Sequence, residues 1–302
     1  MSIVEVCEHA GFCFGVERAV NLVEKLLSED RAPQEASEAG SFENKRDASL
    51  GGPLYTYGPI IHNETVVENF ESRGVRILNN PEELRQAVPG TLVIRSHGVS
   101  RAEEELMRSL GFAVEDATCP FVKAIHHKVQ QASEEGRTVF ITGDSAHSEV
   151  KAIVGWCENR PYVIQDEADI PLLPPDTPLT VLSQTTFHVN KFKKIVEIIK
   201  KRYYNTFVVN TICNATQIRQ QETEELAGKA DAMIVIGGSR SSNTRKLVEI
   251  CEAICAKTYY VRSFEDLLQQ GFQPVRFVGI TAGASTPKNI IEEVQNFVRS
   301  KF

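Results

Sequence analysis

Three of the seven cysteines occupy equivalent positions along the chain and have the chemistry of metal ligands. Cys13, Cys119 and Cys213 each follow a short β-branched segment and precede a helical stretch. The start of a helix favours the thiolate, which is the form of cysteine that binds metal. Thiolates are soft ligands, so the set is typical of an iron–sulfur cluster, with zinc as the main competitor. Three ligands would leave one iron of a four-iron cluster open, which favours chemistry at the metal over electron transfer alone.

The spacing of the cysteines excludes the commoner cysteine sites. Their odd count argues against a disulfide framework, and no C-x-x-C pair of the zinc-ribbon, thioredoxin or ferredoxin type occurs. Cys157, Cys251 and Cys255 lie on apolar helical stretches and are expected to be buried structural side chains. Cys7 has no counterpart in the other parts of the chain, so its role stays open.

A second group of polar residues, in loops that follow strand-like segments, has the chemistry of an anion site. Imidazoles, hydroxyls, an amide and the N–H groups of helix starts can together bind phosphate oxygens. A lone loop histidine is usually a solvated surface residue, but three in equivalent loops favour a shared site. The group comprises His62, His97, His147, Ser241, Asn243 and Ser285. Gly237-Gly238-Ser239 lacks the rest of a P-loop, so a nucleotide is not expected.

Glu149 is a candidate general acid. It follows His147 by two residues at a predicted helix start. A carboxyl group close to a cluster and a phosphate should have a raised pKa, which suits proton donation. Thr185 could relay the proton or hold a leaving hydroxyl. The alternative role for Glu149 is a charge that stabilises the helix N-terminus.

These residues lie at matching steps of a threefold repeat. In each copy a strand leads to a cysteine, a helix follows, and a second strand ends in a polar loop that opens another helix. The cysteine and that loop are 28 residues apart in the second and third copies and 49 apart in the first. Alternating strands and helices predict parallel α/β units, whose functional groups gather at the carboxyl ends of the strands. The predicted fold class is therefore α/β, with three pseudo-threefold-related units (a trefoil) whose parallel sheets surround a central iron–sulfur site.

The repeat divides the chain into four segments. Residues 1–13 form an N-terminal strand and the first cluster ligand, and residues 14–118 form the first α/β unit. Residues 119–209 form the second unit, and residues 210–302 form the third unit with a C-terminal helix. The insertion in the first unit, residues 31–52, is polar and has no period, which predicts a surface loop.

Composition limits the function further. The net charge of −7 argues against a nucleic-acid binder, which needs clustered Lys and Arg. No apolar run approaches the roughly 18–20 residues that span a bilayer, so no membrane association is expected. The N-terminal residues lack the features of a signal peptide, which predicts a cytoplasmic protein.

Nine motifs, in one order along nearly the whole chain outside the insertion, resemble the LytB/IspH family of 4-hydroxy-3-methylbut-2-enyl diphosphate reductases. They are Gly11-Phe12-Cys13-Phe14-Gly15-Val16, Gly58-Pro59-Ile60-Ile61-His62-Asn63, Ser96-His97-Gly98-Val99-Ser100, Asp116-Ala117-Thr118-Cys119-Pro120, His147-Ser148-Glu149-Val150, Ser183-Gln184-Thr185-Thr186, Ile212-Cys213-Asn214-Ala215-Thr216, Ser241-Ser242-Asn243 and Thr281-Ala282-Gly283-Ala284-Ser285. The resemblance departs at Phe14, where a small residue is common, and at Ser148, where proline is common.

The resemblance implies a role for each matching residue. A 4Fe–4S cluster would be held by Cys13, Cys119 and Cys213, with one open iron. Glu149 would be the catalytic acid, and Thr185 would assist it and contact substrate. The diphosphate would be bound by His62, His97, His147, Ser241, Ser242, Asn243 and Ser285.

The resemblance also implies the reaction. The family reduces an allylic diphosphate, 4-hydroxy-3-methylbut-2-enyl diphosphate, to isopentenyl and dimethylallyl diphosphate, the last step of the non-mevalonate isoprenoid pathway. Two electrons would come from a donor such as ferredoxin or flavodoxin. Two other functions stay open: a hydro-lyase with an open-iron cluster, which needs no external electrons, and an iron–sulfur redox sensor or phosphate-binding module.

Overall fold

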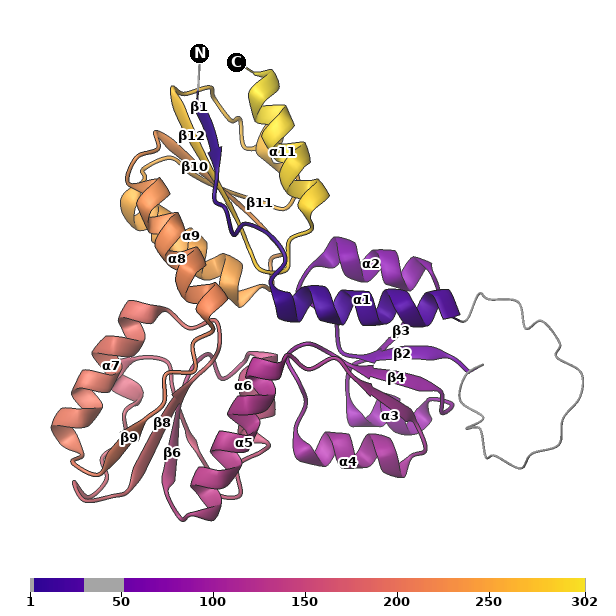
Figure 1. The fold of residues 1–302 in the computed structure, drawn as a ribbon, viewed down its shortest axis with the longest axis vertical. Helices are drawn as coiled ribbons and strands as arrows, with labels where there is room; N and C mark the ends of the chain where they lie inside the picture. The colour runs from indigo at the N-terminus through magenta and orange to yellow at the C-terminus, as the bar shows by residue number, and fades with distance from the viewer. Residues whose placement is uncertain (1–2, 30–51, 302) are drawn as a thin grey trace, which may run out of the picture.

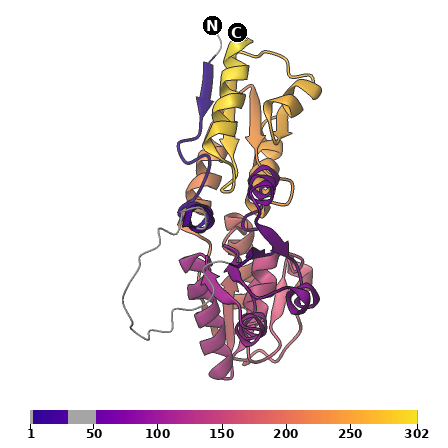
Figure 2. The same cartoon turned by 90° about the vertical axis from the view of Figure 1, so that its right-hand side faces the viewer.

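Three four-stranded parallel sheets surround a common centre in the computed structural model, which describes residues 3–29 and 52–301. Each sheet and its helices form one lobe of a flat trefoil (Figures 1 and 2). The predicted α/β fold with three parallel-sheet units is therefore confirmed. The predicted surface loop at residues 31–52 lies, apart from Gly52, outside the described residues.

The first lobe contains the sheet β3–β2–β4–β5. Its strands are β2 (Leu54–Tyr57), β3 (Arg76–Leu78), β4 (Thr91–Ile94) and β5 (Ala113–Asp116). Its helices are α1 (Phe14–Glu29), α2 (Glu64–Ser72), α3 (Pro81–Gln86) and α4 (Arg101–Ser109). Because side chains alternate along β4, Val93 packs with α1 and α2 on one face, and Leu92 and Ile94 pack with α3 and α4 on the other.

The second lobe contains the sheet β7–β6–β8–β9. Its strands are β6 (Thr138–Thr142), β7 (Tyr162–Ile164), β8 (Leu179–Ser183) and β9 (Thr206–Val208). Its helices are α5 (Pro120–Glu134), α6 (Ser148–Val154), α7 (Val189–Arg202) and a short 3-10 helix, Glu167–Asp169. Helices α5 and α6 cover one face of the sheet and α7 covers the other.

The third lobe contains the sheet β1–β12–β10–β11, so it joins the two ends of the chain. Its strands are β1 (Ile3–Val6), β10 (Ala232–Ile236), β11 (Thr258–Val261) and β12 (Phe277–Ala282). Its helices are α8 (Asn214–Ala227), α9 (Ser242–Ile254), α10 (Phe264–Gln269) and α11 (Lys288–Ser300). All five residues of β10 are buried, as expected for a central parallel strand with helices on both faces.

The chain passes from one lobe to the next at each of the three candidate cysteine ligands. Strand β1 pairs with β12 in the third lobe, yet Cys13 leads into α1, which packs in the first lobe. In the same way Cys119 links β5 to α5, and Cys213 links β9 to α8. The three crossings lie where the lobes meet (Figure 1). The proposed division at residues 14–118, 119–209 and 210–302 stays a prediction.

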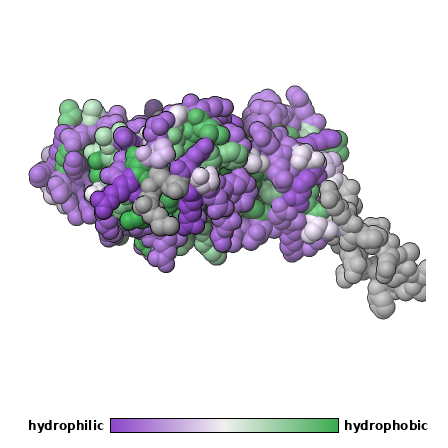
Figure 3. Space-filling model, turned by 90° about the horizontal axis from the view of Figure 1, so that it is seen from above, coloured by the Kyte–Doolittle hydropathy of each residue, from purple (hydrophilic) through white to green (hydrophobic). Residues whose placement is uncertain are grey.

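Two expectations about the other cysteines need correction. Cys157 lies in the turn after α6 and is only partly buried, because α6 ends at Val154. Cys255 caps the end of α9 and does not lie within it, although it is buried together with Cys251. In the described part of the chain, no helix has both the length and the apolar character needed to cross a bilayer. Hydrophilic side chains cover most of the face seen in Figure 3, with hydrophobic ones in scattered patches.

Candidate functional site

A central cavity lies where the three lobes meet, and every site residue predicted from the sequence lines it. The empty space among its residues is about 700 Å³, counting the part open to solvent. A pocket of this size can hold a small ligand or cofactor. The predicted residues that line it are Cys13, Cys119, Cys213, His62, His97, His147, Glu149, Thr185, Ser241, Ser242, Asn243 and Ser285.

Each cysteine is held by one backbone hydrogen bond to a polar loop. The N–H of Cys119 donates to Ser96 O at 2.9 Å, and that of Cys213 donates to Thr185 O at 3.0 Å. The N–H of Cys13 donates to Ala284 O at 3.2 Å. The threefold pattern thus couples every candidate metal ligand to a loop of the candidate substrate site.

The three cysteine side chains line the same cavity, and the charges of Cys13 and Cys213 act on Cys119. Cys119 Sγ would lie 2.5 Å from a Cβ built on Gly15, so only a glycine allows α1 to approach this thiol. Backbone N–H groups at the start of α5 and α8 point at the sulfurs of Cys119 and Cys213 and lower their pKa values. Burial outweighs them, however, and raises the pKa of Cys119 to about 11 and that of Cys213 as well. The expected net lowering by helix starts is therefore wrong for these two thiols without a bound metal.

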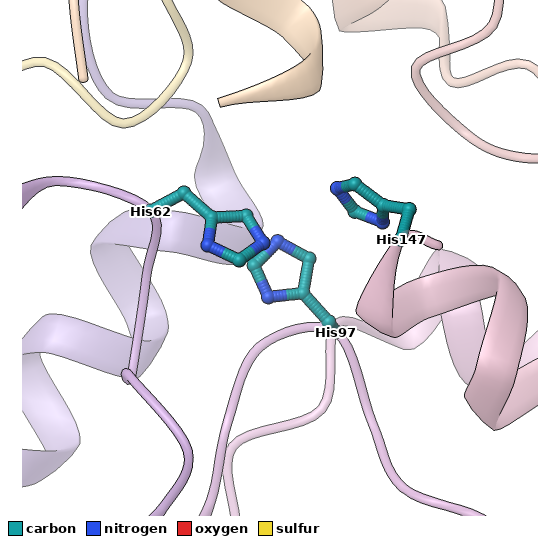
Figure 4. A group of neighbouring side chains, drawn as sticks. All are labelled: His62, His97 and His147. Atoms are coloured by element: carbon teal, nitrogen blue, oxygen red, sulfur yellow. The ribbon is translucent and has the colours of Figure 1, made fainter. Parts of the chain in front are cut away.

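Three histidine rings from separate loops converge in the cavity (Figure 4). The ring centroids of His62 and His97 are 4.3 Å apart, and those of His62 and His147 are 5.2 Å apart. Burial lowers the pKa of His62 to about 4 and that of His147 to about 3, with Arg95 adding to both shifts. The pKa of His97 is also lowered, by burial first and then by the other two rings. The three rings are therefore neutral at pH 7.

These depressed pKa values predict a stability that falls in mild acid. In the unfolded chain histidine is protonated near pH 6.5, but the folded site resists protonation. The contribution of these histidines to the free energy of unfolding is therefore fully present above pH 6.5. It is lost as the pH falls towards the folded pKa values of about 4 for His62 and about 3 for His147. The free energy of unfolding should fall by up to about 1.4 kcal/mol per pH unit for each histidine. Urea unfolding of metal-free protein at pH 7, 6 and 5 measures this slope. His147→Gln should reduce the slope by about 1.4 kcal/mol per pH unit, which corresponds to one proton. Equal slopes in the two proteins would contradict the lowered pKa of His147.

The three histidines could also hold a divalent metal, because one nitrogen of each lies within 4.8 Å of the others. Electrostatics favours an anion instead. Arg95, Arg240 and Arg245 are all close enough to lower the pKa of His62. A positive field that opposes protonation also opposes metal binding and attracts phosphate.

The third lobe contributes the start of α9 to the same anion site. Ser241 caps the helix, and Ser242 accepts a hydrogen bond from Thr186 Oγ1 at 3.1 Å. Asn243 is 3% exposed, and within the described residues neither its Oδ1 nor its Nδ2 has a hydrogen-bond partner. Buried amides normally have partners, so an unpaired one that lines a cavity indicates a ligand. Ser285 Oγ donates to His62 O at 3.0 Å, which links this lobe to the first.

Glu149 is fixed by Thr185 between the cysteines and the histidines. The N–H and hydroxyl of Thr185 donate to the two carboxylate oxygens of Glu149 at 2.6 and 2.7 Å. Glu149 is 1% exposed, and burial raises its pKa despite these two hydrogen bonds. The predicted raised pKa is confirmed. A buried carboxyl group that is easily protonated and held in one orientation can donate a proton into the cavity.

Some residues of the cavity were not found from the sequence. Arg219 and Thr216, on the first two turns of α8, line the cavity near Cys213. Charged residues inside a helix usually face solvent, so the sequence contains no signal for Arg219, whereas Thr216 belongs to the motif around Cys213, which could have indicated it. Ser148, one of the departures from the family pattern, has its Oγ 3.3 Å from His62 Nε2. Phe14, the other departure, is 63% exposed and has little effect on packing.

Comparisons with known proteins show the family of the chain. The family model of the LytB protein matches residues 4–299. A 4-hydroxy-3-methylbut-2-enyl diphosphate reductase of Caldanaerobacter subterraneus subsp. tengcongensis is 38% identical over 98% of this chain and 96% of that protein. One of Aquifex aeolicus is 38% identical over 97% of this chain and 95% of that protein.

Two solved structures are also similar. One, described as (E)-4-hydroxy-3-methyl-but-2-enyl diphosphate reductase, the terminal enzyme of the non-mevalonate pathway, has 37% identity and a TM-score of 0.67 and covers 99% of this chain and 100% of that chain. The other, the E-1-hydroxy-2-methyl-but-2-enyl-4-diphosphate reductase from Plasmodium falciparum, has 26% identity and a TM-score of 0.84 and covers 99% of this chain and 87% of that chain.

Proposed function

The chain belongs to the LytB protein family, and from this membership we propose that it reduces 4-hydroxy-3-methylbut-2-enyl diphosphate to isopentenyl and dimethylallyl diphosphate. The substrate takes up two electrons and two protons, its C–O bond to the terminal hydroxyl breaks, and one water leaves. The observation that carries the proposal is a single cavity that combines three thiols, an anion site and a buried acid.

The cofactor that fits this cavity is a 4Fe–4S cluster held by Cys13, Cys119 and Cys213. The donor set supports it, because three soft sulfur ligands line the cavity. When bound, the cluster would supply electrons one at a time and a Lewis-acidic iron without a protein ligand. The two products of the reaction differ only in where the second proton is added.

The remaining residues divide into two roles. The diphosphate would be bound by His62, His97, His147, Ser241, Ser242, Asn243 and Ser285, because these supply neutral donors at the start of α9 and in the histidine loops. Glu149 would protonate the leaving hydroxyl and Thr185 would orient it, since both carboxylate oxygens already bond to Thr185.

Asn243→Ala tests the anion site. The amide makes no hydrogen bond with the described residues, so its removal should leave the free energy of unfolding unchanged or slightly higher. It should raise KM by about tenfold or more, because a hydrogen bond to a charged group contributes about 1.5–3 kcal/mol. Steady-state kinetics and urea unfolding measure the two effects. Asn190→Ala, at an exposed helix start, is the control; a wild-type KM in Asn243→Ala contradicts the role.

The electrons would come from a low-potential one-electron donor, for which ferredoxin and flavodoxin are our candidates. Oxygen-free purification, iron and sulfide analysis, and turnover with a chemical reductant test the whole proposal. Turnover without any reductant would instead support a hydro-lyase. A protein that holds iron but converts no substrate with a strong reductant would support a redox sensor or phosphate-binding module.

A further inference from the structure

Arg219 is a buried arginine that the reaction outlined above leaves without a role. It is 2% exposed and lines the central cavity together with the three cysteines. Its hydrogen bonds within the described residues all go to backbone carbonyls: Nε to His9 O at 2.9 Å, Nη2 to Gly11 O at 2.8 Å and Nη1 to Ala215 O at 3.3 Å. Glu222, on the same helix, pairs with His9 instead.

These bonds fix the guanidinium between two of the candidate metal ligands. His9 and Gly11 belong to the loop that leads to Cys13, whereas Ala215 follows Cys213 by two residues. Carbonyl dipoles satisfy the donors of the guanidinium but do not neutralise its charge. A fully buried cation normally pairs with an anion, so a negative group is expected close by.

Sulfurs of two candidate metal ligands act on Arg219, and so does the carboxylate of Glu222, which already pairs with His9. Burial lowers the pKa of Arg219, and the charges of Cys13, Glu222 and Cys213 act in the opposite direction. Three thiolates with a cluster would provide the missing negative charge. That charge grows by one unit when the cluster accepts an electron, and a fixed cation in a poorly solvated site favours the more negative state.

We propose that Arg219 is the internal counter-charge of the cluster and raises its reduction potential, so that electron transfer from the donor becomes more favourable. This inference rests on the proposed function, because it requires the cluster. Arg219 is thus a positioning and tuning residue, which acts on substrate only through the metal group.

Arg18 supplies a matched control from the neighbouring lobe. Its guanidinium donates to Thr118 O and Asp116 O, both at 3.1 Å, and so holds the loop before Cys119 as Arg219 holds the loop before Cys13. Arg18 is only partly buried and does not line the cavity. It therefore shares the tethering role but should have a weaker field at the metal, because solvent screens it.

The experiment is a redox titration of the cluster-loaded protein, followed by EPR, in four variants. Arg219→Gln and Arg219→Met should reduce the equilibrium constant for one-electron reduction by tenfold or more, a shift of about 59 mV to lower potential. Arg219→Lys should remain near the wild type because it keeps the charge, and Arg18→Met should change the potential less than Arg219→Met does.

Iron loss from the Arg219 variants also separates a requirement for charge from a tethering role. If the folded Gln and Met variants lose iron while the Lys variant retains it, the charge requirement is supported. A wild-type potential in Arg219→Gln, or an Arg219→Lys variant that loses iron or shifts as far as the neutral variants, overturns the inference and leaves a tethering role only. A wild-type protein without iron would instead contradict the proposed function itself.

Discussion

Glu149→Gln is expected to reduce kcat by at least about 100-fold and to leave the iron content of the protein unchanged. General acids of this kind typically contribute about 10²–10⁴-fold to rate. The glutamine amide keeps the size of the side chain, and its oxygen can still accept the hydrogen bond from Thr185 N–H while its NH2 group donates to the turned Thr185 hydroxyl, but the amide is not an acid and cannot protonate a leaving group. Because the carboxyl group is 1% exposed, solvent cannot easily replace that proton. Anaerobic steady-state kinetics and iron analysis of the same preparation measure the two effects.

Glu64→Gln is the matched control, because Glu64 is the counterpart of Glu149 in the first copy of the repeat. Its carboxylate bonds to Ser239 Oγ at 2.7 Å and does not line the central cavity. The pKa of Glu64 is lowered, since hydrogen bonds from Ser239 and the charge of Arg240 outweigh its desolvation. Glu64 is partly buried but does not line the cavity, so its substitution should reduce kcat far less than that of Glu149. Equal losses in the two variants would mean that neither carboxyl group is a specific proton donor.

The two glutamates show which features of the site the sequence could predict and which it could not. The repeat indicates that a loop opens a helix in each copy, and the structure places Glu64 at the first position of α2 and Glu149 at the second position of α6. It cannot predict their environments, which depend on the side chains that other loops bring to each. Thr185 faces Glu149, whereas Ser239 and the exposed Arg240 face Glu64.

The fold was predictable for a related reason. Helices and strands follow from local pattern, and parallel sheets gather the carboxyl ends of their strands, so twelve site residues could be assigned to one centre. The sheet that β1 would join was not predictable, because pairing with β12 links residues at opposite ends of the chain. The burial of Arg219 was also not predictable, since the sequence does not distinguish a buried arginine from a solvated one.

Cys119→Ser is expected to remove the metal group and to reduce turnover to background. The serine hydroxyl is a hard ligand that stays protonated at neutral pH, so it replaces a thiolate poorly. Burial already raises the pKa of the Cys119 thiol to about 11, and metal binding must supply the free energy to deprotonate it. The thiolates of Cys13 and Cys213, at the other two lobe crossings, would then have to hold the cluster alone. Absorption spectra and iron and sulfide analysis of oxygen-free preparations measure the loss.

Cys157→Ser provides the control, because Cys157 lies outside the cavity in the turn after α6. It should keep the iron content and turnover of the wild type. The comparison also tests the role of the lobe crossings, since the chain passes from the first lobe to the second at Cys119. If the cluster links the lobes, it stabilises the folded state that binds it. Cys119→Ser should then unfold at a lower temperature than the cluster-loaded wild type, by as much as removal of iron lowers the unfolding temperature of the wild type. An iron-replete, active Cys119→Ser protein would exclude Cys119 as a ligand.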